Sequence, residues 1–171
     1  MAIIKRYELA LNDINTAYKT AATEVATLLP GREVNVRQGV PNDLGDSVRP
    51  YRFNQIGLVV SDTVFSTLYT YQVEIATVQV FYGLKSRDST PTVTNVRVTV
   101  GGTRARQWHM EDPYDNSTFP AEIFFDIADL LSIKERSTVI IEGIPQAVTA
   151  NLEPFFWVGE ERGRTVNKAR P

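Results

Sequence analysis

The sequence contains no cysteine and a single histidine among its 171 residues. Without thiols the chain can form neither a disulfide framework nor a thiolate metal site, so packing or assembly must supply its stability. One histidine excludes a histidine-rich metal centre, and any Ser-His-Asp arrangement would have to use His109. Neither G-x-S-x-G nor the phosphate-binding G-x-x-x-x-G-K-[ST] motif occurs. We therefore expect no cofactor, no metal and no enzymatic activity, with His109 at a strand end.

A surplus of either charge and long apolar runs are also missing. The 18 basic and 20 acidic residues give a formal net charge of -2, whereas nucleic-acid-binding proteins usually carry a concentrated basic surplus. No run approaches the roughly 18 apolar residues of a membrane span, and charge interrupts the N-terminus too early for a signal peptide. The composition predicts a soluble chain with one buried core and with neither nucleic acid nor membrane as a partner.

An apolar repeat runs through the N-terminal segment. The a and d positions of its successive heptads are filled by Ile4, Tyr7, Leu11, Ile14, Tyr18, Ala21, Val25 and Leu28. This repeat predicts an amphipathic helix, although the threonine and asparagine content also permits an extended arm. Pro30 and Gly31 end either structure. Because a monomer could cover such a stripe only with its own sheet, the repeat favours a homo-oligomer.

From Tyr51 onwards β-branched and aromatic residues are concentrated between turn clusters, a pattern typical of strands. With a short strand at residues 33–37, seven or eight strands result, which predicts a mainly β protein, a β-sandwich or jelly roll. Residues 38–50 are predicted to form a long loop. The apolar parity changes near Ala76 and Thr77, so we expect a bulge or bend there that carries the chain between two sheets.

Further strands are predicted at residues 122–127, 138–144 and 155–158. The C-terminal segment that follows is rich in basic residues and nearly free of large apolar ones, which predicts a flexible tail. The expected organisation is therefore an N-terminal helix or arm, a β-sandwich domain and a basic C-terminal tail, at residues 1–30, 31–158 and 159–171.

A Gly-Gly pair at residues 101–102 predicts a tight hairpin, because two glycines can supply the positive φ angles of such a turn. With Val100 opposite Thr103, Arg97 would face Arg106 across the strands. Like charges in that position would gain nothing in an isolated fold, so this face would need a partner.

Arginine and tryptophan gather on the same predicted face, and both are enriched in interface hot spots. The predicted interface residues are Arg97, Arg104, Arg106 and Trp108, together with Arg162 and Arg164 of the tail. Two alternatives remain open for the hairpin arginines: an intramolecular acid such as Glu74 or Glu111 neutralises them, or they lie apart in water. Binding of single-stranded nucleic acid is a third, which the net acidity disfavours.

Acidic residues offer two further kinds of site. Oxygen ligands for calcium are present at Asp43, Asp46, Glu111, Asp112, Asp115 and Asn116. They lack the D-x-D-x-D-G repeat, and turn capping explains them adequately. A carboxylate pair for glycoside hydrolysis could be drawn from Glu74, Glu122, Asp126 and Glu142. Because each alternates with apolar neighbours, a solvated strand face is the favoured interpretation.

The whole pattern resembles structural proteins of tailed-bacteriophage virions, either capsid decoration (cement) proteins or neck and tail components. The resemblance rests on the cysteine-free β body at residues 51–158, the N-terminal segment at residues 1–29 and the basic tail at residues 161–171. It implies a β-sandwich in the virion that binds the major capsid protein or another virion protein, often as a dimer or trimer.

Two alternatives accompany this interpretation. The segment at residues 17–29, followed by Pro30-Gly31 and Val34-Asn35-Val36, resembles the helix-then-strand opening of tail-completion proteins. A carbohydrate-binding β-sandwich or a glycosidase could instead use Trp108, Trp157 and the tyrosines as surfaces on which sugars stack.

Overall fold

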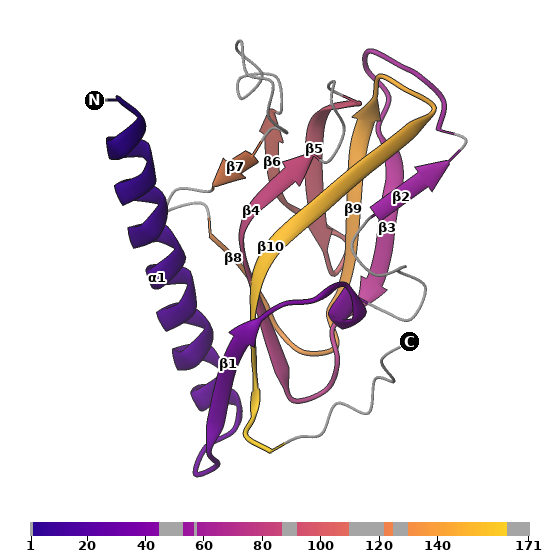
Figure 1. Cartoon of the computed structure of the whole chain (residues 1–171). Coiled ribbons are helices and arrows are strands. Elements are labelled where there is room, and N and C mark those ends of the chain that lie inside the picture. Colours follow the sequence, from indigo (N-terminus) through magenta and orange to yellow (C-terminus); the bar gives the residue numbers. More distant parts are fainter. Residues whose placement is uncertain are drawn as a thin grey trace.

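The computed structural model describes residues 2–44, 53–56, 58–86, 92–109, 122–124 and 130–163. Within them, one α-helix lies against two antiparallel β-sheets (Figure 1). The predicted fold class, mainly β with an N-terminal helix, is confirmed. No helix of the described segments is long and apolar enough to cross a membrane.

The helix α1 (Ala2–Leu28) precedes all the strands. The larger sheet contains β1 (Val34–Gln38), β2 (Phe53–Ile56), β4 (Thr77–Ser86), β7 (Glu122–Phe124), β8 (Leu131–Ile133) and β10 (Thr149–Glu161). The smaller sheet has the order β3 (Ser66–Gln72), β9 (Thr138–Pro145), β5 (Val93–Val100) and β6 (Thr103–His109). A short 3-10 helix, η1 (Pro41–Leu44), lies in the part of the predicted 38–50 loop that the structure describes.

Helix α1 covers the outer face of the larger sheet (Figure 1). Ala17, Ala21 and Val25 are buried against it. Gly159 of β10 permits a close approach, because a Cβ atom there would lie 2.8 Å from the side chain of Val25. The helical interpretation of the heptad repeat is therefore correct. Since the stripe within residues 14–28 packs on the chain's own sheet, this part of it gives no reason for self-assembly, and the homo-oligomer stays a prediction.

Threonine is an indifferent helix former, yet α1 contains a row of threonines. Each hydroxyl donates a 2.9 Å hydrogen bond to the carbonyl oxygen four residues earlier, in Thr16, Thr20, Thr23 and Thr27. These bonds satisfy the polar groups within the helix itself. The helix can therefore carry threonines while its small apolar side chains face the sheet.

Strand β4 is buried on both faces because it lies between the helix and the smaller sheet. Val78, Val80 and Tyr82 pack with α1, whereas Phe81 and Leu84 belong to the core between the sheets. The core between the sheets also includes Leu68, Tyr71, Val96, Val98, Ile133, Val139, Ile141, Leu152, Phe156 and Val158. The two cores give three layers in the order helix, larger sheet and smaller sheet.

The chain changes sheets at the predicted parity break. Strand β3 ends at Gln72 in the smaller sheet, and β4 begins at Thr77 in the larger one. Ala76 adopts a left-handed backbone conformation with φ of 59°. The predicted position and the change of sheet are therefore correct, and of the expected bulge or bend the structure has a turn between two strands.

Strand β10 is much longer than the strand predicted at residues 155–158. It pairs with β2 as far as Leu152 and with β1 from Trp157 onwards. Pro154 lies in the gap between these pairings, so no neighbouring strand on that side requires its missing N–H group. Because β10 continues to Glu161, the prediction that the tail begins at residue 159 was wrong. The structure describes the chain only as far as residue 163.

Candidate interaction surface

The β5–β6 hairpin forms at the predicted glycine turn but with a different register. Val100 pairs with Thr103 as expected, after which the register shifts by one residue. Arg97 therefore lies opposite Gln107, and the predicted pairing of Arg97 with Arg106 was wrong. An extra residue in one strand produces such a shift, and it removes the like-charge contact from which the interface hypothesis started.

Arg97 pairs instead with Glu142 of the adjacent strand β9. Its Nε and Nη2 atoms donate hydrogen bonds of 2.6 and 2.8 Å to the two carboxylate oxygens. The guanidinium also lies over the ring of Phe65, 4.1 Å from the ring centroid, a cation–π arrangement. These hydrogen bonds lower the pKa of Glu142 and raise the pKa of Arg97. An intramolecular acid thus neutralises Arg97, although it is neither Glu74 nor Glu111.

The other predicted interface residues do not form one site in the described part of the chain. Arg106 is exposed on β6. Arg162 lies beyond β10, where its Nη1 is 3.3 Å from a carboxylate oxygen of Glu33 in a highly exposed pair. Arg104 and Trp108 lie in β6. The structure does not describe their side chains. Arg164 likewise lies beyond the described residues.

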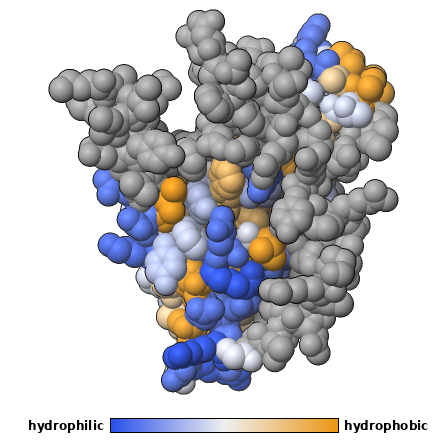
Figure 2. Space-filling model, in the orientation of Figure 1, coloured by the Kyte–Doolittle hydropathy of each residue, from blue (hydrophilic) through white to orange (hydrophobic). Residues whose placement is uncertain are grey.

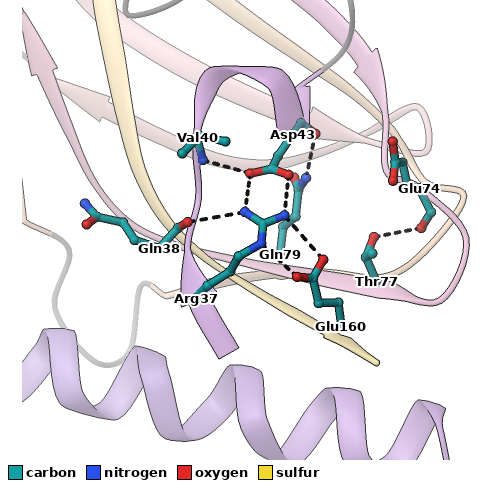
Figure 3. Close-up of polar contacts among 8 residues, drawn as sticks. All are labelled: Arg37, Gln38, Val40, Asp43, Glu74, Thr77, Gln79 and Glu160. Atoms are coloured by element: carbon teal, nitrogen blue, oxygen red, sulfur yellow. Dashed lines mark hydrogen bonds and ion pairs between the residues drawn. The ribbon is translucent and has the colours of Figure 1, made fainter. Parts of the chain in front are cut away.

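An extensive polar cluster surrounds Arg37 of β1 (Figure 3). Arg37 donates bonds of 2.7 and 2.8 Å to Asp43 and of 2.8 Å to Glu160. Both carboxylates are buried, and Asp43 also accepts the Val40 N–H at 2.8 Å. The hydrogen bonds to Asp43 raise the pKa of Arg37, and burial opposes them. Asp43, a candidate calcium ligand in the sequence, is therefore the partner of an arginine.

This cluster continues into both sheets. Gln79 of β4 donates a 3.0 Å hydrogen bond to the Asp43 carbonyl, and the hydroxyl of Tyr71 donates to Gln79 at 2.7 Å. The hydroxyl of Tyr69 donates to the carbonyl of Leu44. Burial raises the pKa of Tyr71, so its hydroxyl keeps its proton and remains a donor. The cluster links β1 and η1 to both sheets. Because its polar groups are bonded to one another, its role is structural, and we call it the Arg37 cluster.

Trp157 of β10 is one of the aromatic residues that the sequence suggested for sugar stacking. Trp157 lies under α1, where its Nε1–H donates to the carbonyl of Ile14 at 3.2 Å. Its ring contacts Tyr18 and Tyr82, with centroid separations of 5.3 and 5.7 Å. Tyr82 is itself buried. Trp157 therefore anchors the helix.

A metal centre is likewise not formed by the residues that the structure describes, where no three acidic or histidine side chains gather. Of the carboxylates considered for hydrolysis, Glu142 is paired with Arg97. Asp126 and the side chain of Glu122 lie outside the described part of the chain, as does the side chain of His109.

Exposed valines form an apolar projection at one end of the sandwich. Val59, Val60 and Val64 lie between β2 and β3 and are 76%, 52% and 62% exposed. Val148, between β9 and β10, is 60% exposed. Figure 2 shows hydrophobic atoms at this end of the molecule, at the upper right. We call these four residues the valine tip.

Hydrogen bonds hold the valine tip in one conformation. The N–H of Leu58 donates to the Val148 carbonyl, and the N–H of Ser61 donates to the Pro145 carbonyl, both at 3.0 Å. Gln146 donates its side-chain Nε2 to the Ser61 carbonyl at 2.9 Å. The hydroxyl oxygen of Ser61 accepts the N–H of Val64 at 2.9 Å. Sequence reasoning missed this surface, because a run such as Leu58-Val59-Val60 is also typical of a buried strand.

The described fold is thus a two-sheet β protein with a helix packed on one sheet. No known protein family and no characterised protein matches the sequence. Among solved structures, the chain is similar to VP2 of the infectious bursal disease virus subviral particle, with 12% identity and a TM-score of 0.34. That likeness covers 77% of this chain but only 33% of VP2.

The chain is also similar to the CBM36-1 domain of a multidomain xylanase from the hindgut metagenome of Trinervitermes trinervoides. Here the identity is 12% and the TM-score 0.35, and the likeness covers 75% of this chain and 99% of that domain. Both likenesses are distant, and neither bears on what this chain binds.

Proposed function

We propose that this chain is a non-enzymatic structural protein of a tailed-bacteriophage virion, where it binds and stabilises the capsid lattice as a decoration or cement protein. The valine tip is the observation that carries the proposal. Contiguous apolar groups exposed on a protein surface mark sites of association. Because hydrogen bonds already fix the tip, binding would cost little conformational entropy.

The shape of the tip favours a protein partner. Small-molecule sites are concave and enclose most of the ligand, whereas the valines lie on a convex projection (Figure 2). A second subunit of a particle, the major capsid protein or another virion protein, can offer the matching depression. Many copies on a closed shell need only modest individual affinity, because simultaneous contacts raise the effective concentration of the others.

A neck or tail-completion protein is the second candidate. Its support is the order of elements at the N-terminus, where α1 ends at Leu28 and β1 begins at Val34. This opening agrees with the helix-then-strand start that suggested such proteins. The strand-rich remainder fits that class less well.

Mass spectrometry of purified virions tests this function. Particles of a phage that encodes the chain would be purified by density gradient, and the chain would be quantified against the major capsid protein. A cement protein should be present in many copies per particle, in a fixed ratio to the capsid protein. A small number of copies would favour the neck or tail instead. Absence of the chain from intact virions would contradict both.

A further inference from the structure

A hollow lies where two turns meet, and it belongs to different strand connections from those of the valine tip. It is lined by Gln72, Val73, Glu74, Ile75 and Arg136, from the β3–β4 and β8–β9 connections. In Figure 1 the β3–β4 connection lies at the lower end of the sheets, and the connection between β2 and β3 lies at the upper end. We call this depression the turn hollow. One molecule therefore carries a projection and a depression at opposite ends.

The walls of the turn hollow are fixed by hydrogen bonds. The N–H of Arg136 donates to the Val73 carbonyl at 2.9 Å, and the N–H of Val73 donates to the Ser137 carbonyl at 3.0 Å. The carboxylate of Glu135 accepts the N–H of Ala76 at 2.5 Å. Each turn also holds a non-glycine residue at positive φ, 59° at Ala76 and 60° at Arg136. Such conformations persist where the surroundings impose them, and they are enriched at functional sites.

The hollow and the tip are complementary in polarity and in charge. Ile75 at the hollow is 55% exposed, and Arg136 beside it is exposed. The tip presents valines together with Asp62, an exposed acid in the same loop. Glu74 also lines the hollow, so an incoming acid would approach on the Arg136 side. Apolar groups can thus meet apolar groups while Asp62 meets Arg136.

We propose that the valine tip of one copy binds the turn hollow of a second copy, with Asp62 facing Arg136. This inference rests on the proposed function, because it names the neighbouring subunit that the tip binds. The contact joins two different surfaces, so it is head-to-tail and forms a ring when the rotation between copies closes. The tip is small compared with the roughly 800 Å² per partner of a standard interface, so each contact should be weak.

Sedimentation of two charge-reversal variants tests the proposal. Asp62→Arg damages the tip but leaves the hollow intact, and Arg136→Asp does the opposite. Aspartate tolerates the left-handed conformation of position 136 better than arginine does, so this variant should fold. Each variant alone should dissociate about tenfold more readily than the wild type, because like charges now meet at the contact. Melting curves check that both variants are folded.

The mixture of the two variants gives the decisive result. In the mixture, Asp62 of the Arg136→Asp variant faces Arg136 of the Asp62→Arg variant, and the arginine introduced at position 62 faces the aspartate introduced at position 136. Both contacts again join opposite charges, so the mixture should associate although neither variant does so alone. The neutral variants Asp62→Asn and Arg136→Asn provide a second pair, with weakened rather than reversed contacts. A mixture that behaves as the separate variants do would overturn the proposal.

Two other results would also reject a head-to-tail contact. One is a wild-type chain that stays monomeric at about 1 mM, where even a millimolar contact is populated. The other is an Arg136→Asp variant that associates as the wild type does, which would indicate tip-to-tip pairing. If the chain is nevertheless found in virions, only the head-to-tail contact fails and the proposed function stands.

Discussion

At the scale of single residues, the pair of Arg97 and Glu142 links stability to pH. Hydrogen bonds from Arg97 lower the pKa of Glu142 below its ordinary value of 4.5. A carboxyl group with a lower pKa in the folded chain than in the unfolded chain adds stability above the unfolded value. That contribution is lost as the pH falls through the folded value. The pair should therefore contribute fully at neutral pH and not at all in strong acid.

Glu142→Gln should lower the free energy of unfolding by about 1 kcal/mol at neutral pH, the scale of a partly exposed bidentate pair. The difference from the wild type should shrink as the pH falls from about 5 towards 2, because Glu142 then becomes neutral as glutamine is. Urea unfolding across this pH range measures it. Glu161→Gln, in the exposed pair with Arg32, is the control and should change little. A difference that is the same at every pH would contradict the assignment.

The partners of individual charged residues could not be predicted from the sequence. Glu142 is 45 residues from Arg97 along the chain, and the one-residue shift in the β5–β6 hairpin depends on how the strands pack. Contacts within a turn were easier to predict from the sequence. Asp43 accepts the N–H of Val40, three residues earlier, as turn capping predicts. Its contact with Arg37 required the folded chain.

At the scale of secondary-structure elements, the Arg37 cluster joins β1 and η1 to β10. Asp43 and Glu160 are 7% and 6% exposed, so removing the arginine would leave two buried carboxylates without their cation. Arg37→Met should therefore lower the free energy of unfolding by about 3–5 kcal/mol. Urea denaturation at neutral pH measures this loss.

The triple variant Arg37→Met, Asp43→Asn and Glu160→Gln provides the matched comparison. It removes all three charges together, so it should be more stable than Arg37→Met alone. If the cost of the triple variant equals the sum of three independent losses, the three residues do not act as one charged cluster.

The elements differ in how far the sequence specified them. The repeat in α1 and the opposite parities of β3 and β4 were visible because they are periodic. The extent of β10 was hidden, since Pro154 normally weakens a strand prediction. Its tolerance depends on the gap between the β2 and β1 pairings, which arises only when distant segments assemble.

At the scale of the whole molecule, the layers were predictable and the exposed valine tip was not. Alternating apolar residues indicate which segments form sheets, but exposure of the valine tip results from how the β2–β3 and β9–β10 connections meet. Arg97, one residue of the predicted arginine face, is instead paired with Glu142 within the chain. Apolar side chains that the chain's own fold leaves exposed are therefore better candidates for a binding surface than charged side chains, which can be paired within the chain.

Incorporation of tip variants into virions tests the central claim, that the chain binds its neighbours through the valine tip. The variant Val59→Thr, Val60→Thr and Val64→Thr keeps the side-chain shape and removes most of the apolar character. Val40→Thr, at a valine that is 48% exposed outside the tip, is the control. Each variant would compete with wild-type chain during particle assembly, and mass spectrometry would measure the ratio in purified virions. The triple variant should be incorporated about tenfold less than the control. Equal incorporation of a triple variant that melts as the wild type does would contradict the claim.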